Sequence, residues 1–180
     1  MVYKYPDVTA PEPADEGAPA RAGDSCGTDH SPPASLPAAR AAVADRLANY
    51  GALLEVGIGR RPGVAARLAA DGRAVTAIDI HDRPVPTGVT FLRRDLCDWA
   101  DRLAGSGAGA DTDPQLEILL HGEIDAIYGL NLPPELHTPA LTVAEAAGAA
   151  FLFTTLGGDP PAVPVERETL DPGTLYVARE

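Results

Sequence analysis

The sequence LLEVGIG, at residues 53–59, decides the fold of this chain. It is typical of a buried strand that ends on an acidic residue, Glu55, and two glycines. Gly57 and Gly59 allow the backbone to turn sharply and a ligand to approach, because neither carries a Cβ that would restrict φ and fill the space. A helix is predicted directly afterwards, over residues 62–70, because Pro62 suits the first helical turn.

A second apolar strand is predicted over residues 73–79, and its last residue is Asp79. That position lies close to the distance at which a nucleotide-binding fold places the acid that contacts ribose. The dinucleotide fingerprint has a third glycine three residues beyond the second, where this chain has Pro62, so NAD is the less favoured ligand. A strand-to-helix turn that binds nothing is the plain structural alternative.

The pattern Glu55-x-Gly57-x-Gly59 resembles the first motif of class I S-adenosylmethionine methyltransferases. The resemblance implies that Glu55 lies near the ammonium group of the cofactor's methionine moiety, beside the two glycines. It also implies that Asp79 accepts the ribose hydroxyls and that Asp95 accepts from the adenine amino group. Ionised carboxylates suit both roles because they are hydrogen-bond acceptors only.

Asp95 has a second, equally weighted explanation, as the N-cap of a helix that begins near Leu96. Apolar runs alternate with helical segments through this part of the chain, as a parallel sheet covered by helices requires. We predict a three-layer, Rossmann-like α/β fold with a mostly parallel sheet, strand order 3-2-1-4-5 and short antiparallel closing strands. The remaining strands are expected at residues 88–92, 124–130, 149–155, 163–166 and 174–178, and the remaining helices at 37–50, 96–103, 116–121 and 134–147.

The run Asn131-Leu-Pro-Pro-Glu135 follows the fourth predicted strand. It resembles the Asn-Pro-Pro-aromatic loop with which amino-methyltransferases hold a target nitrogen, although Leu132 is inserted and Glu135 stands where the ring would be. The resemblance implies that Asn131 contacts a substrate and that Glu135 or His137 accepts a proton. A rigid helix start at the two prolines is the alternative.

Leu156-Gly-Gly-Asp-Pro-Pro161 follows the fifth predicted strand in place of a long helix. Asp159 is expected to reach into the cleft, so Asn131, Glu135 and Asp159 are the candidate catalytic residues. The few residues that remain leave no room for a substrate-recognition domain. We therefore expect a small-molecule substrate, or a substrate presented by a protein partner.

The net charge of the 180-residue chain is −12, and Lys4 is its only lysine. This composition resembles the acidic proteomes of salt-accumulating archaea. In an ordinary cytosol such a charge disfavours nucleic acid, but high salt screens it, so this partner is neither supported nor excluded. Arg60, Arg61, Arg93 and Arg94 are able to contact phosphate locally, and solvated side chains are their plainer interpretation.

We expect an acidic, disordered tail at residues 1–35, one Rossmann-like domain at 36–180, and a flexible insertion at about 104–115. No apolar run reaches membrane-spanning length, and the N-terminus has no secretory pattern, which predicts a cytoplasmic protein. Cys26 and Cys97 lack metal-ligand or disulfide-framework spacing, and no metal site is predicted.

The segment from Leu53 onward resembles uncharacterised protein family 0146, a family of small archaeal proteins with a Rossmann-like fold. The resemblance rests on four stretches: Glu55-Val-Gly-Ile-Gly-Arg-Arg-Pro62, Thr76-Ala-Ile-Asp79, Asn131-Leu-Pro-Pro-Glu-Leu136 and Leu156-Gly-Gly-Asp-Pro160. It implies the fold but no activity. The leading hypothesis is an S-adenosylmethionine-dependent methyltransferase. The alternatives are a noncatalytic cofactor- or nucleotide-binding module that acts with a partner, and an NAD-binding oxidoreductase.

Overall fold

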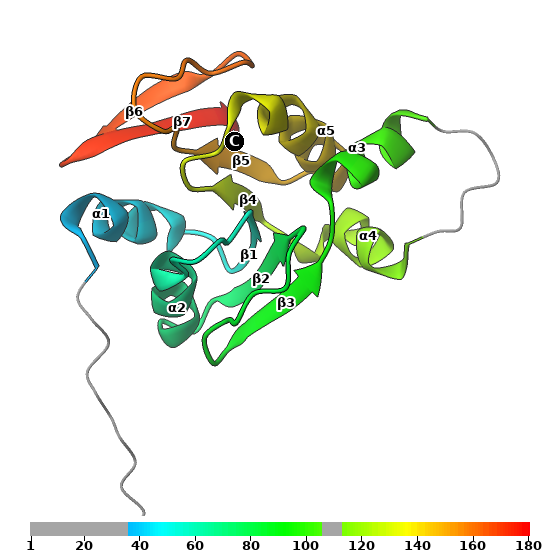
Figure 1. The fold of residues 1–180 in the computed structure, drawn as a ribbon, viewed down its shortest axis with the longest axis horizontal. Helices are drawn as coiled ribbons and strands as arrows, with labels where there is room; N and C mark the ends of the chain where they lie inside the picture. The colour runs from blue at the N-terminus through cyan, green and yellow to red at the C-terminus, as the bar shows by residue number, and fades with distance from the viewer. Residues whose placement is uncertain (1–35, 106–112) are drawn as a thin grey trace, which may run out of the picture. The chain divides into compact units, whose positions relative to one another are not determined.

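The computed structural model describes residues 36–105 and 113–180. In these ranges seven strands form one sheet in the order β3-β2-β1-β4-β5-β7-β6 (Figure 1). The first five strands pair in parallel, and β7 runs antiparallel to both β5 and β6. The predicted α/β class and the order 3-2-1-4-5 are confirmed. The strands are β1 (Ala52–Val56), β2 (Ala74–Asp79), β3 (Val89–Arg93), β4 (Ala126–Gly129), β5 (Ala150–Phe153), β6 (Glu166–Leu170) and β7 (Gly173–Arg179).

Helices cover both faces of the sheet and make the three layers (Figure 1). One face packs against α1 (Ala38–Leu47) and α2 (Gly63–Ala70). The other packs against α3 (Leu96–Ala104), α4 (Pro114–Ile118), the short helical segment η1 (Leu119–Glu123) and α5 (His137–Ala147). A 3₁₀ turn, η2 (Pro134–Leu136), leads into α5. The predicted helices at 62–70, 96–103 and 134–147 are confirmed to within a few residues.

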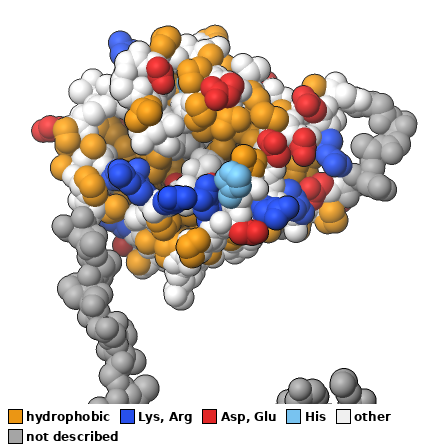
Figure 2. Space-filling model, viewed as in Figure 1, with side chains coloured by type: hydrophobic (Ala, Val, Ile, Leu, Met, Phe, Trp, Pro, Cys, Tyr) orange, Lys and Arg blue, Asp and Glu red, His pale blue; other side chains and the backbone are white. Residues whose placement is uncertain are grey.

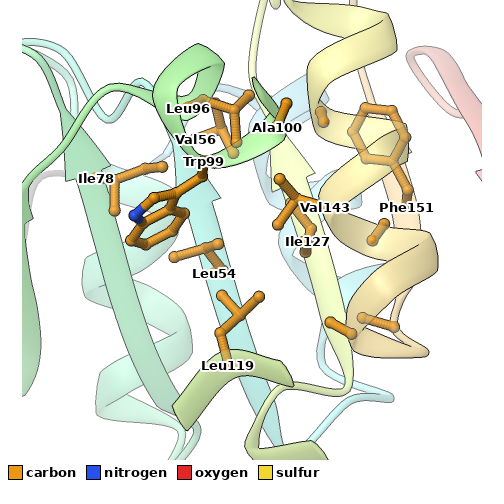
Figure 3. Packing of buried hydrophobic residues seen from close by; sticks show 14 of the residues in the cluster. Leu54, Val56, Ile78, Leu96, Trp99, Ala100, Leu119, Ile127, Val143 and Phe151 are labelled. Atoms are coloured by element: carbon orange, nitrogen blue, oxygen red, sulfur yellow. The ribbon is translucent and has the colours of Figure 1, made fainter. Parts of the chain in front are cut away.

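The two apolar cores follow from the alternation of side chains along each strand. In β1, Leu54 and Val56 pack with Trp99 in the core beneath α3 and α5 (Figure 3). Leu53 packs in the opposite core, beneath α1 and α2. By the same alternation Glu55 faces α1 and α2, so an acidic side chain lies beside the mostly apolar residues of that core.

The closing strands differ from the prediction in one respect. A strand was expected at 163–166, whereas β6 begins at Glu166, and Val163 and Val165 pack on the core from the preceding loop. Apolar character signalled the burial of these two valines, but pairing with β7 sets where the strand lies. The expected pairing partner at 174–178 lies within β7, which runs from Gly173 to Arg179.

The helix predicted at 116–121 begins two residues earlier, because the Asp113 side chain caps it by accepting from the backbone N–H of Gln115. It then widens into η1. The predicted tail at 1–35 and most of the predicted insertion at 104–115 lie outside the described residues. The described ends of that insertion belong to α3 and α4.

Candidate functional site

The glycine turn after β1 is present as predicted. Gly57 has φ 67° and Gly59 has φ 60°, both in the left-handed region that favours glycine. The backbone N–H groups of Gly57 and Ile58 donate to the carbonyl of Ile78 on β2, at 2.9 and 3.3 Å. A Cβ at Gly57 would meet no atom within 4 Å, so the space in front of the turn is open.

Glu55 lies one residue before the end of β1 and is only 1% exposed. The sheet register places Glu55 beside Tyr128 of β4, and the Tyr128 hydroxyl donates to its Oε2 at 2.8 Å. Burial raises the pKa of Glu55 to about 7, although the Tyr128 hydrogen bond and the charge of Arg40 both lower it. Burial and the nearby Glu55 also raise the pKa of Tyr128 well above its ordinary value. Glu55 therefore exchanges its proton near neutrality.

The glycine turn lines a hollow of about 220 Å³. The hollow brings acidic and basic groups together, because Glu55 and three arginines, from α1 and from the turn, line it. Arg40 also fixes the turn, because its Nη1 donates to the carbonyl of Arg61 at 2.8 Å. The lining residues are Arg40, Glu55, Gly57, Ile58, Gly59, Arg60, Arg61 and Leu130.

Asp79 ends β2 as predicted, and its carboxylate already has three protein donors. Oδ1 accepts from the N–H of His81 at 2.9 Å, while Oδ2 accepts from the N–H of Gly59 and from Nε of Arg83, each at 3.1 Å. Burial raises the pKa of Asp79, but these hydrogen bonds outweigh it and hold the pKa below the ordinary 3.8. A carboxylate has about four acceptor positions, so roughly one remains for a ligand.

A groove of about 420 Å³ runs over the carboxyl ends of β1 and β2. It meets the first hollow at Gly57, which lines both. Asp79, Asp95 and Glu135 contribute carboxyl groups to its wall. Asp95 is the N-cap of α3, because its Oδ1 accepts from the N–H of Cys97 at 2.9 Å. The helix-capping explanation is therefore confirmed, and the adenine contact stays a prediction.

The three candidate catalytic residues do not all meet at the groove. Glu135 lines it, whereas Asn131 and Asp159 are exposed and line neither the groove nor the hollow. Asn131 has φ 53°, and its backbone N–H donates to Oγ1 of Thr154 at 2.8 Å, which links the loops after β4 and β5.

His137 was considered as a proton acceptor, and the structure contradicts this. It is fully buried; its Nδ1 accepts from the N–H of Ala162 at 3.0 Å, and its Nε2 lies 3.1 Å from the carbonyl of Leu132. The only ring lone pair of a neutral histidine is thus already used. His137 instead ties the start of α5 to the loops after β4 and β5.

Three contributors to the site escaped the sequence analysis. Tyr128 could not be found, because its position beside Glu55 depends on a register between strands far apart in the sequence. Arg40 lies on a helix whose packing was unknown. Arg83 had a usable signal, since it stands four residues after Asp79 and pairs with it.

Within residues 36–105 and 113–180, no cluster of three or more His, Cys, Asp or Glu side chains is placed to hold a metal ion. None of the helices in those ranges combines the length and apolar character needed to cross a membrane.

The fold defines a class of protein: Rossmann-like, with a groove at the carboxyl edge of its sheet. The model of the Uncharacterised protein family (UPF0146) matches residues 38–104 and 107–180, and the chain belongs to this family. UPF0146 proteins from two strains of Halobacterium salinarum are each 45% identical over 139 residues, covering 77% of this chain and 95% of theirs. One from Archaeoglobus fulgidus is 36% identical over 119 residues, covering 65% and 78%.

Among solved structures, the chain is similar to the MycE methyltransferase from the mycinamycin biosynthetic pathway, determined in complex with Mg and SAH. The identity is 13% and the TM-score is 0.40. The alignment covers 74% of this chain and 43% of that one, so the chain spans less than half of that enzyme. This similarity concerns the fold alone.

Proposed function

We propose that this protein binds S-adenosylmethionine across the hollow and the groove, and transfers its methyl group to an acceptor. One observation carries the proposal: a hollow lined by one carboxyl group and three guanidinium groups joins, at Gly57, a groove walled by Asp79 and Asp95. The amino-acid end of this cofactor is a zwitterion, which suits a carboxyl group beside guanidinium groups. Its adenosine end suits carboxylate acceptors in a partly apolar groove.

The charged groups around the glycine turn fit this cofactor better than NAD. A pyrophosphate at the glycine turn would lie next to Glu55, a carboxyl group that ionises near neutral pH. An ammonium group at the same place would favour the ionised form and would lower the pKa of Glu55. NAD therefore remains the less favoured ligand, both because Glu55 lies beside the turn and because the third glycine of the dinucleotide fingerprint is missing.

Each residue has a part in the proposed reaction. Glu55 holds the ammonium, an arginine of the hollow holds the cofactor's carboxylate, and Asp79 holds a ribose hydroxyl through its remaining acceptor position. The bound cofactor supplies a methyl group on a sulfonium, which is already activated for in-line transfer. Glu135 is the acidic residue of the acceptor loop that lines the groove, so we assign it the acceptor's proton. Asn131 and Asp159 orient the acceptor from the loops after β4 and β5.

Titration calorimetry with S-adenosylhomocysteine and with NAD tests the cofactor. We expect S-adenosylhomocysteine to bind with proton release, and its affinity to fall by up to about tenfold for each pH unit below the pKa of Glu55. Asp79→Asn should weaken binding by roughly 1 to 3 kcal/mol, and Glu55→Gln should remove the pH dependence. Binding of NAD alone, or binding of S-adenosylhomocysteine that is independent of pH in the wild type, would contradict the proposal.

A noncatalytic cofactor-binding module is the second candidate, and the positions of Asn131 and Asp159 outside the groove favour it. Incubation with methyl-labelled cofactor and desalted extract of the source cells separates the two. An enzyme transfers label to an acceptor and loses the transfer, but not the cofactor affinity, in Glu135→Gln. A module binds the cofactor and leaves its methyl group in place.

A further inference from the structure

Arginines gather along the carboxyl edge of the sheet. Figure 2 shows a band of positively charged side chains across one face, and all of those in the described residues are arginines because Lys4 lies outside them. Beyond Asp95, a third hollow of about 450 Å³ continues the groove and shares Arg94 with it. The arginines that line the three hollows are Arg40, Arg60, Arg61, Arg83, Arg93, Arg94 and Arg102.

Much of this positive charge is already neutralised by nearby carboxylates. Arg83 pairs with Asp79 and Arg94 with Asp113, both at 3.1 Å. Arg93 lies 3.4 Å from Asp82. Asp98 also lines the third hollow. The groove and the third hollow therefore offer no continuous track of unpaired cations, which a polynucleotide would need.

The turn after β1 is different. Arg60 and Arg61 are exposed, and in the ranges 36–105 and 113–180 neither forms an ion pair. Their backbone is held in place by Arg40 and by the neighbouring Gly59, whose N–H donates to Asp79. The side chains therefore project from an anchored turn and remain available to a ligand.

The hollow also holds more positive charge than the proposed cofactor requires. The carboxylate of the cofactor occupies one guanidinium group, and Glu55 is the one acidic residue in the lining. Leu130 lines the same hollow and directly precedes Asn131, so part of the hollow lies beside the loop after β4. The remaining guanidinium charge therefore lies near the loop to which we assign the acceptor.

We propose that Arg60 and Arg61 bind a phosphate group on the methyl acceptor, and that the acceptor is a small phosphorylated molecule. Two adjacent guanidinium forks match the several oxygens of a phosphate, and they hold it better than point charges would. The local character of the unpaired charge, on a chain of net charge −12, favours a small molecule over a polynucleotide. The proposal rests on the proposed methyl transfer.

Equilibrium dialysis with labelled inorganic phosphate tests this, at about pH 8 and one fixed ionic strength, on protein saturated with S-adenosylhomocysteine. We expect phosphate to bind, and the double variant Arg60→Ala with Arg61→Ala to weaken it by roughly tenfold or more for each arginine. The matched control is Arg67→Ala with Arg167→Ala, which removes the same charge away from the hollows and should leave binding unchanged. Lysine at both positions 60 and 61 should restore only part of the affinity.

Equal binding of succinate, which carries two charges but no phosphate, would overturn the proposal, and so would an equal loss of phosphate binding in the control variant. Binding of single-stranded RNA through Arg60 and Arg61 without binding of phosphate would also overturn it. Competition between phosphate and S-adenosylhomocysteine would overturn it too, because both arginines would then belong to the cofactor. Failure of the proposed function has a separate signature. Phosphate bound through Arg60 and Arg61 by a protein that does not bind S-adenosylhomocysteine would overturn the methyl transfer and leave the anion site in place.

Discussion

The loops after β1 and β4 carry the two motifs that the sequence marks most clearly, and the structure uses them in opposite ways. After β1, the two glycines face open space and Arg60 and Arg61 line a hollow. After β4, the backbone groups of the loop bond to the protein itself, and the side chain of Glu135 lines the groove. The backbone N–H groups of Asn131 and Leu132 donate to Thr154, and the carbonyl of Leu132 meets His137.

Leu132 explains much of this difference. It is the residue inserted into the Asn-Pro-Pro pattern, it is 2% exposed, and it lies so close to Gly129 that a Cβ there would come within 2.9 Å of it. The insertion therefore anchors the loop in the core, where packing leaves little freedom. A loop whose hydrogen-bonding groups are satisfied internally serves as scaffold, whereas one that directs them into a hollow is placed to bind a ligand.

The largest expected effect tests the scaffold role. His137→Ala removes a buried ring that lies 4.3 Å from the ring of Phe153, and it leaves the partners of both ring nitrogens unpaired. We expect a loss of roughly 3 kcal/mol in the free energy of unfolding, measured by urea denaturation. The affinity of the folded protein for S-adenosylhomocysteine should stay within about threefold, since Glu55 and Asp79 lie on β1 and β2, whereas His137 lies on α5.

The control is His81→Ala, an exposed histidine that follows β2, which should change stability by no more than about 0.5 kcal/mol. If His137→Ala leaves stability intact but abolishes methyl transfer, His137 acts in the reaction and is not part of the scaffold.

The second prediction concerns Glu55, where we expect a substitution to raise the free energy of unfolding instead of lowering it. The folded protein keeps the proton of Glu55 up to about pH 7, whereas the unfolded chain releases it near 4.5. Between these values the folded state binds more protons, so rising pH lowers stability, by roughly 3 kcal/mol in total. This contribution is fully present below the lower value and lost above the upper one.

Glu55→Gln keeps the shape and removes the titration. Urea denaturation should show the variant about as stable as the wild type near pH 5 and roughly 3 kcal/mol more stable near pH 8. Asp79 and Asp113 do not interfere, because their lowered pKa values lie below this window. A difference in stability that is the same at both pH values would show that Glu55 does not hold a proton in the folded state.

The smallest expected effect concerns Asn131, and it distinguishes a need for its backbone angle from a role of its side chain in the reaction. Its φ of 53° suits asparagine or glycine, so Asn131→Ala should cost about 1 kcal/mol of stability and Asn131→Gly should cost less than about 0.5 kcal/mol. Both variants should lose methyl transfer if the side chain orients the acceptor. Full transfer by Asn131→Gly would show that the residue is there for its backbone angle alone.

Much of the fold was predictable because parallel strands buried on both faces are nearly continuous apolar runs, and glycines and prolines mark their ends. Glu55, the two glycines and Asp79 were identified from local spacing, and the structure places all four around connected hollows. Asn131 and Asp159 were harder, because their exposed positions depend on how the loops after β4 and β5 pack.

The sequence by itself determined the order of elements, the glycine turn and the acidic residues at the strand ends, since each depends on neighbours along the chain. Only the tertiary structure decided that Tyr128 lies against Glu55, that Arg40 reaches the turn, and that His137 is structural. The physical reason is register and packing. Whether a carboxyl group is buried, partnered or free depends on residues far away in sequence, and that sets both its pKa and its ability to hold a ligand.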